Sequence, residues 1–87
     1  MDKVSTVRVY VKDDGTLDGM FAMVNSKALI SVAWFTSGRL HITFRGNGNL
    51  IYVYNDVPAE VWNELVNANS IGKKYNEIVK DKFTYSV

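Results

Sequence analysis

The sequence contains no cysteine, one histidine and one proline. Without cysteine there is no disulfide framework, and zinc ribbons, iron–sulfur clusters and cysteine nucleophiles are excluded together. His41 is the one side chain suited to general-base chemistry near neutral pH, and no Gly-x-Ser-x-Gly motif accompanies it. Asp13, Asp14 and Asp18 do not have the spacing of a calcium loop. We therefore expect no enzyme activity, no metal site and no cofactor.

A charge excess and a long apolar run are lacking as well. Ten Lys or Arg and nine Asp or Glu leave a net charge of +1 at pH 7, far from the basic balance of an obvious nucleic-acid binder. Met1-Asp2-Lys3 is followed by alternating residues, so neither a secretory signal nor a membrane span is predicted. We expect a cytoplasmic protein with no membrane partner.

What is present is enough apolar material for one core. Hydrophobic residues make up 47% of the chain and charged residues 22%, which is typical of a folded protein. A chain of 87 residues buries too little surface for two separate cores. The sequence therefore predicts a single domain over residues 1–87.

Alternating apolar residues predict the strands. The clearest segments are 7–11, 29–35, 39–45 and 50–55. Residues 20–24 fit either a strand or an irregular segment that covers the core. Within 29–35, alternation predicts Ile30 on the same face as Val32 and Trp34. We expect a small antiparallel sheet of three to four strands.

The register of the hairpin near Asn47-Gly48 decides where two tyrosines lie. A two-residue turn there pairs Tyr52 with Thr43 and Tyr54 with His41. Both rings would then share a face with Arg39 and Arg45. A three-residue loop over 46–48 shifts the pairing by one and places Tyr52 beside Ile42 and Tyr54 beside Leu40, in the core. The sequence leaves both registers open.

Two helices are predicted after the strands. Pro58 suits a first helical turn, and Val61, Trp62 and Leu65 form an apolar stripe behind it. Ser70 is an N-cap residue for a second helix, whose apolar stripe is Ile71, Tyr75, Ile78 and Val79. The tail 83–87 is expected to pack as a last extended piece. The predicted fold class is α+β, with both helices packed on one face of the sheet.

A string of residues between Asn25 and Tyr85 follows a known family pattern. It consists of Ser26, Ile30 and Trp34; Leu40, Ile42 and Phe44; Tyr52-Val53-Tyr54; Val57-Pro58; Leu65 and Ala68; Ser70-Ile71-Gly72; and Tyr75-Asn76 with Ile78. The chain resembles the KTSC domain family, modules at the C-terminus of some lysyl-tRNA synthetases and small stand-alone bacterial and phage proteins. The resemblance implies a core over 25–85 with an N-terminal strand extension over 1–24, and its synthetase context suggests RNA binding.

Two groups of residues are candidate binding sites. In the first, Tyr52 and Tyr54 stack on bases while Arg39 and Arg45 contact phosphates beside His41, as on other sheet platforms for single strands. In the second, the start of the last helix offers Ser70, Gly72, Lys73 and Lys74 to a phosphate, with Gly72 permitting close backbone approach. The alternative is that these residues have structural roles only. Strand packing would explain Tyr52 and Tyr54, and helix capping and packing would explain Ser70 and Gly72.

The sequence thus predicts a non-catalytic binding module for RNA, single-stranded nucleic acid or a nucleotide. The alternative is a protein-interaction module, such as a phage-encoded modulator that binds a host protein. That module would use an exposed strand edge or the N-terminal extension with Met20 and Phe21.

Overall fold

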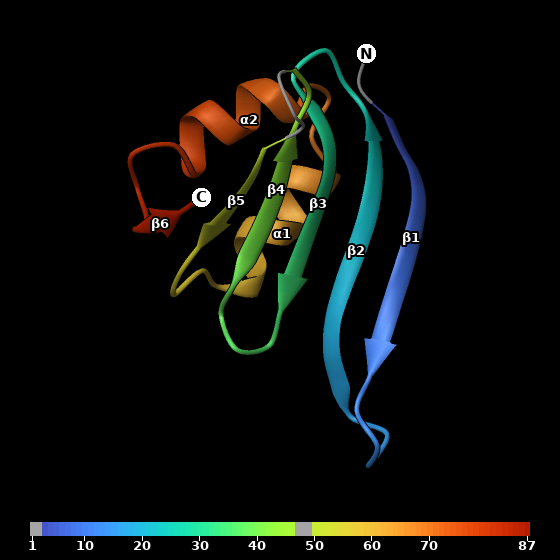
Figure 1. Ribbon diagram of the computed structural model, residues 1–87. Helices are drawn as coiled ribbons and strands as arrows, with labels where there is room; N and C mark the ends of the chain where they lie inside the picture. Colours follow the sequence, from blue (N-terminus) through green and yellow to red (C-terminus); the bar gives the residue numbers. More distant parts are fainter. Residues whose placement is uncertain (1–2, 47–49) are drawn as a thin grey trace.

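The computed structural model describes residues 3–46 and 50–87, and it shows one antiparallel sheet with two helices on one face (Figure 1). The strands follow one another in chain order across the sheet. The elements are β1 (Lys3–Val11), β2 (Leu17–Asn25), β3 (Leu29–Phe35), β4 (Leu40–Phe44), β5 (Ile51–Tyr54), α1 (Ala59–Val66), α2 (Ile71–Ile78) and β6 (Tyr85–Ser86). The predicted α+β class is confirmed.

The prediction of three to four strands is wrong, because the described residues form a six-stranded sheet. Residues 20–24 lie within the nine-residue strand β2, which pairs with β1 and β3. The tail adds β6, two residues that pair with Val53 and Tyr54 of β5.

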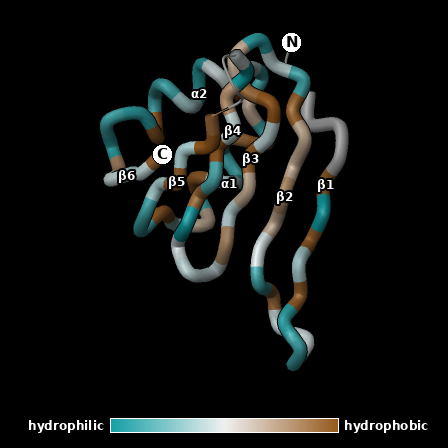
Figure 2. Tube along the Cα trace, viewed as in Figure 1, coloured by the Kyte–Doolittle hydropathy of each residue, from teal (hydrophilic) through white to brown (hydrophobic). Residues whose placement is uncertain are grey.

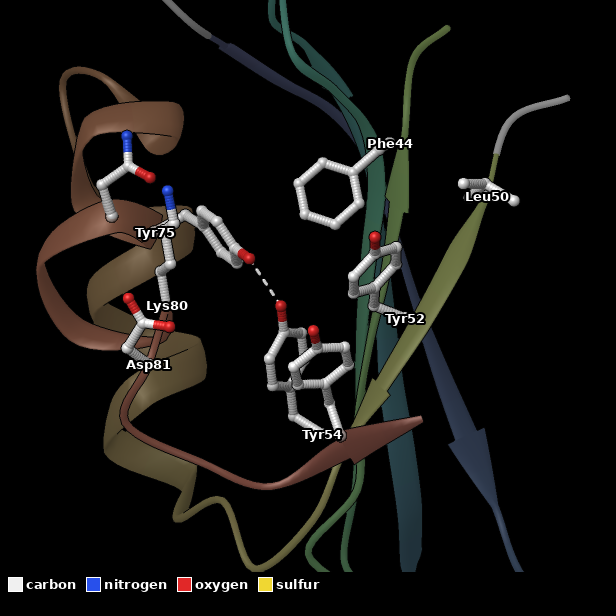
Figure 3. Close-up of a pocket in the computed structure, with 9 residues that line it drawn as sticks. Phe44, Leu50, Tyr52, Tyr54, Tyr75, Lys80 and Asp81 are labelled. Atoms are coloured by element: carbon white, nitrogen blue, oxygen red, sulfur yellow. Dashed lines mark hydrogen bonds between the residues drawn. The ribbon is translucent and has the colours of Figure 1, made fainter. Parts of the chain in front are cut away.

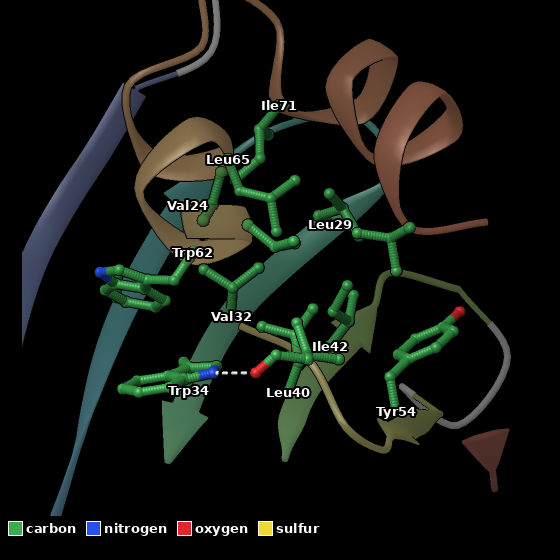
Figure 4. Close-up of a cluster of buried hydrophobic side chains, with 14 residues drawn as sticks. Val24, Leu29, Val32, Trp34, Leu40, Ile42, Tyr54, Trp62, Leu65 and Ile71 are labelled. Carbon is green, nitrogen blue, oxygen red and sulfur yellow. Dashed lines mark hydrogen bonds between the residues drawn. The ribbon is translucent and has the colours of Figure 1, made fainter. Parts of the chain in front are cut away.

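The core lies between the sheet and the helices (Figure 4). Val32, Leu40 and Ile42 project from the central strands and are completely buried. Trp62 and Leu65 of α1 pack on the same cluster, as the apolar stripe of the first helix predicts. The buried indole N–H of Trp34 donates to the carbonyl oxygen of Val57 at 2.8 Å, which ties β3 to the segment before α1.

Strand β3 departs from simple alternation at its start. The pairing of β3 with β4 shifts between Leu29 and Ser31, so Ile30 is an extra residue in the ladder. Leu29 is consequently completely buried and joins Val32 and Trp34 in the core cluster, whereas Ile30 is only half-buried. The prediction that Ile30 shares the face of Val32 and Trp34 is wrong.

The hairpin of β1 and β2 forms one side of the sheet and extends past the helices (Figure 1). Ala22 and Val24 of β2 are buried in the core, because β2 lies beside β3. Apolar and polar residues alternate along β1 (Figure 2), but Val7, Val9 and Val11 are all more than half exposed. The core therefore reaches β2 but does not include Val7, Val9 or Val11 of β1.

The two helices begin differently. Pro58 is the N-cap of α1 and no side chain caps that helix, whereas the Ser70 hydroxyl accepts the Lys73 backbone N–H at 3.4 Å. The predicted cap of the second helix is thus confirmed. Within residues 3–46 and 50–87, neither helix has the length and apolar character needed to cross a membrane.

Candidate binding site

The pairing of β4 with β5 settles which face the two tyrosines occupy. Tyr52 pairs with Ile42 and Tyr54 with Leu40, while His41 pairs with Val53. The predicted turn residues Asn47 and Gly48 lie outside the described residues, but this pairing is the one predicted for the three-residue loop. Because side chains alternate between faces, a shift of one residue moves both tyrosines to the helix side.

The first predicted group is therefore divided between the two faces of the sheet. Tyr52 and Tyr54 do not share a face with Arg39, His41 and Arg45, and the register predicted for a two-residue turn is wrong. The guanidinium Nε of Arg45 donates to the carbonyl oxygen of Ser26 at 3.2 Å. His41 packs on Phe35 with 4.9 Å between ring centroids. Burial, together with the nearby charge of Arg39, lowers the pKa of His41, so its imidazole is neutral at pH 7.

On the helix side, Tyr52 and Tyr54 belong to an aromatic cluster built by four elements (Figure 3). Strand β4 contributes Phe44, α2 contributes Tyr75 and β6 contributes Tyr85. The rings of Tyr52 and Tyr85 are stacked, with centroids 5.1 Å apart and planes 19° apart. Phe44 meets Tyr52 and Tyr75 edge-on, at 5.0 Å and 5.2 Å. We call these five residues the tyrosine cluster.

The hydroxyls of Tyr54 and Tyr75 are hydrogen-bonded at 2.5 Å, joining β5 to α2 (Figure 3). Burial, followed by this hydrogen bond, raises the pKa of Tyr54, and burial also raises the pKa of Tyr75. Both hydroxyls are therefore protonated at neutral pH. Since the pair carries two protons and its mutual bond uses one, the second proton is available to an acceptor.

The cluster lines a cavity of about 430 Å³, whose remaining walls are Leu50, Asn76, Lys80 and Asp81. Tyr54 at its base is 2% exposed, whereas Tyr85 at its mouth is 54% exposed. The cavity thus has a neutral hydroxyl pair inside and an aromatic ring, an ammonium and a carboxylate at the rim. Such a volume is in the usual range of small-molecule sites, about 300–1,000 Å³.

The opposite face of the sheet carries a second cavity, of about 480 Å³. Its small central residues are Ser31 and Ala33, and aromatic side chains including Phe21, Phe35 and Tyr10 surround them. Met20 is not part of it, because this residue packs against the core on the helix side. The predicted pair of Met20 and Phe21 is therefore divided as well. We call this surface the outer groove.

The second predicted group does come together, at the start of α2. Ser70, Lys73 and Lys74 line one shallow surface, but Ser70 caps the helix and Lys74 forms an ion pair with Glu77 at 3.6 Å. A Cβ added at Gly72 would meet its nearest neighbour, Ser26 Oγ, at an ordinary 3.9 Å. No neighbouring protein atom therefore requires a glycine at this position, and the predicted approach of a phosphate to Gly72 stays a prediction.

Sequence reasoning assigned only Tyr52 and Tyr54 of the lining residues to a site and missed the others, among them Phe44, Tyr75, Lys80 and Tyr85. Tyr75 was predicted on the apolar stripe of the second helix and Phe44 in the strand segment 39–45, and neither prediction shows that the two rings meet. Tyr85 follows the second helix in a tail with no periodic pattern, so only its aromatic character marked it. Among the described residues, no group of three or more acidic, histidine or cysteine side chains could hold a metal ion.

Comparison with known proteins identifies the family. The family model of the KTSC domain matches residues 25–83, more than half of the chain, and the protein belongs to the KTSC domain family. A protein of Tsukamurella paurometabola is 35% identical over 54 residues, which are 62% of this chain and 81% of that protein. The crystal structure of a KTSC domain protein from Yersinia pestis has a TM-score of 0.66, covering 93% of this chain and 96% of that chain at 21% identity. The predicted resemblance is confirmed.

Proposed function

We propose that this protein is a non-catalytic binding module for RNA, single-stranded nucleic acid or a nucleotide, and that one base occupies the cavity of the tyrosine cluster. The observation that carries the proposal is a cavity of about 430 Å³ lined largely by aromatic rings. A nucleobase has a π face for a ring and acceptor atoms for a hydroxyl proton, so it matches both features of this cavity.

The rim of the cavity suits a phosphate attached to that base. Lys80 is exposed beside the mouth of the cavity. In this proposal Lys80 contacts the phosphate in place of Arg39 and Arg45, because those two residues lie on the other face. One ammonium predicts a shallow dependence on salt, with a slope of log K against log salt of about −0.7 for a single strand. A platform of several arginines would give a steeper slope.

A titration of the isotope-labelled protein followed by amide NMR tests the proposal. The ligands are a short single-stranded RNA, the matching DNA, and the corresponding mononucleotide, which distinguish a strand from a free nucleotide. We expect shifts at Tyr52, Tyr75, Lys80 and Tyr85. Tyr85→Ala is expected to weaken binding by about 5–150-fold, since a stacked base contributes about 1–3 kcal/mol.

Tyr10→Ala is the matched control, because Tyr10 is a 40% exposed tyrosine on the outer face. It is expected to leave the affinity unchanged. Shifts confined to Arg39, His41 and Arg45, with affinity lost in Tyr10→Ala, would place the ligand on the outer face. An absence of shifts at millimolar ligand would contradict nucleic-acid and nucleotide binding altogether.

A protein-interaction module, for example one that binds a host protein, is the second candidate, and the outer groove favours it. Within the described part of the chain, no helix covers the sheet on this side, and Phe21, Phe35 and Ile51 line the groove. Affinity capture from a bacterial lysate, followed by mass spectrometry, should retain a partner with the wild type and lose it with Phe21→Ala. Identical retention by both proteins would contradict this candidate.

A further inference from the structure

We propose that β1 is a dimerisation edge, on which a second copy of this chain adds its own β1 in antiparallel orientation. The inference concerns a surface outside the tyrosine cluster and does not depend on the proposed function. Among the described residues, β1 pairs only with β2, and its other side carries no strand (Figure 1).

The backbone of β1 shows which groups face the open side. The Lys12 N–H donates to the Thr16 carbonyl at 2.8 Å, and the Lys12 carbonyl accepts the Gly15 N–H at 2.9 Å. Both groups of Lys12 are thus turned toward β2. Because neighbouring residues of a strand point their N–H and C=O groups to opposite sides, Val7, Val9 and Val11 direct theirs outward. A long edge of this kind is a template for another strand.

Val7 and Val9 present an apolar stripe on the helix side of the sheet. Val7 pairs with Ala22 and Val9 with Met20, which belong to the core or pack against it. These two valines nevertheless remain 58% exposed, since the helices do not reach β1. Antiparallel addition of a second β1 about a two-fold axis would place the two stripes side by side on one face.

Charge selects the register. Centring the two-fold axis on Val9 pairs Val9 with its own copy, Val7 with Val11, and Arg8 with the second copy's Tyr10. Arg8 and Tyr10 both lie on the outer face, because they pair with Phe21 and Gly19 of β2, and a guanidinium beside a tyrosine ring is favourable. Moving the register by two residues keeps the backbone bonds but sets Arg8 against a second Arg8 or against Lys12. Like charges directly opposite each other oppose both shifts.

Sedimentation equilibrium over a concentration series tests the dimer. We expect the wild type to approach twice the 9.8 kDa of one chain, and Val9→Lys to remain a single chain at every concentration. Ile51→Lys is the matched control, because Ile51 is a 50% exposed strand residue on β5. A wild type that stays a single chain at millimolar concentration overturns the proposal, and so does a dimer abolished by Ile51→Lys and kept by Val9→Lys.

Crosslinking tests the register independently of the mass. The chain has no cysteine, so Val9→Cys introduces a unique thiol. In the proposed register, the two Cα atoms at this position lie about 5.5 Å apart, within the disulfide range. We expect Val9→Cys to form a reducible covalent dimer in a glutathione buffer and Val7→Cys, which has equal exposure, to remain uncrosslinked. Equal yields from the two variants overturn the register and with it the proposal.

Discussion

Gly19 and Gly72 both lie within secondary structure, yet their surroundings predict opposite effects of an added methyl group. A Cβ at Gly19 would lie 2.5 Å from Cδ1 of Phe35 and 2.7 Å from the backbone oxygen of Trp34. A Cβ at Gly72 would be 3.9 Å from its nearest neighbour. Gly19 is therefore required for the approach of Phe35 to β2, whereas Gly72 only adds backbone entropy to the unfolded chain.

The corresponding alanine variants test this contrast. We expect Gly19→Ala to lower the free energy of unfolding by about 1–3 kcal/mol, because a backbone atom cannot move aside as a flexible side chain does. Gly72→Ala should raise it by about 0.5–1 kcal/mol, since alanine favours a helix. Urea denaturation with a common m-value measures both changes. Equal stabilities of the two variants would contradict the packing at Gly19.

His41 gives the protein a dependence on pH with a definite sign. Its pKa in the folded state lies below the ordinary 6.5, because of burial and then the charge of Arg39. As the pH falls below 6.5, the unfolded chain takes up this proton before the folded chain does. The contribution of His41 to stability is thus complete above that pH and is lost as the pH passes through the folded pKa.

We therefore expect His41→Gln to flatten the decline in stability between neutral and mildly acidic pH. The free energy of unfolding is measured by urea denaturation at several pH values for both proteins. Titration of the carboxylates is common to the two and cancels in their difference. A wild-type curve parallel to that of the variant would show that His41 titrates normally.

At the scale of elements, the eight-residue helix α2 depends on its cap, because short helices are marginal by themselves. Ser70→Ala removes the acceptor for the Lys73 N–H, and we expect a loss of about 1 kcal/mol in the free energy of unfolding. Ser70→Asp retains an acceptor and should restore most of it. If Ser70→Asp remains as unstable as Ser70→Ala, Ser70 does not stabilise the protein by capping α2.

The elements also show how far the sequence could predict the fold and the site. Alternation correctly separated Leu40 and Ile42 from His41, because β4 is a regular strand. The bulge that buries Leu29 and the register that turns Tyr52 inward depend on pairing between strands, which one strand's pattern does not contain. The segment of the KTSC pattern, residues 25–85, contains most of the core residues but not Ala22 and Val24 of β2. Of the tyrosine cluster, the sequence placed Tyr52 and Tyr54 on the core side in only one of its two registers. It could not place Tyr85, because the pairing of β6 with β5 brings this residue to the cluster.

At the scale of the whole molecule, the core does not coincide with the segment that defines the family. The family model begins at residue 25, but Ala22 and Val24 of β2 are buried among core residues and Met20 packs against them. By contrast, β1 contributes exposed valines to the helix side. The hairpin therefore has two parts with different roles, of which β2 completes the core and β1 supplies an edge.

Two truncations distinguish these roles. Deletion of residues 1–24 removes the buried side chains of β2 and exposes that side of β3, and we expect no cooperative unfolding transition. The stability of a chain of 87 residues is only about 4–13 kcal/mol at 0.05–0.15 kcal/mol per residue, so it cannot sustain such a loss. Deletion of residues 1–11 should leave a cooperative unfolding transition with its midpoint at a lower denaturant concentration, because residues 7–11 of β1 are exposed. Cooperative unfolding of residues 25–87 alone would show instead that the segment matching the family is an independent folding unit.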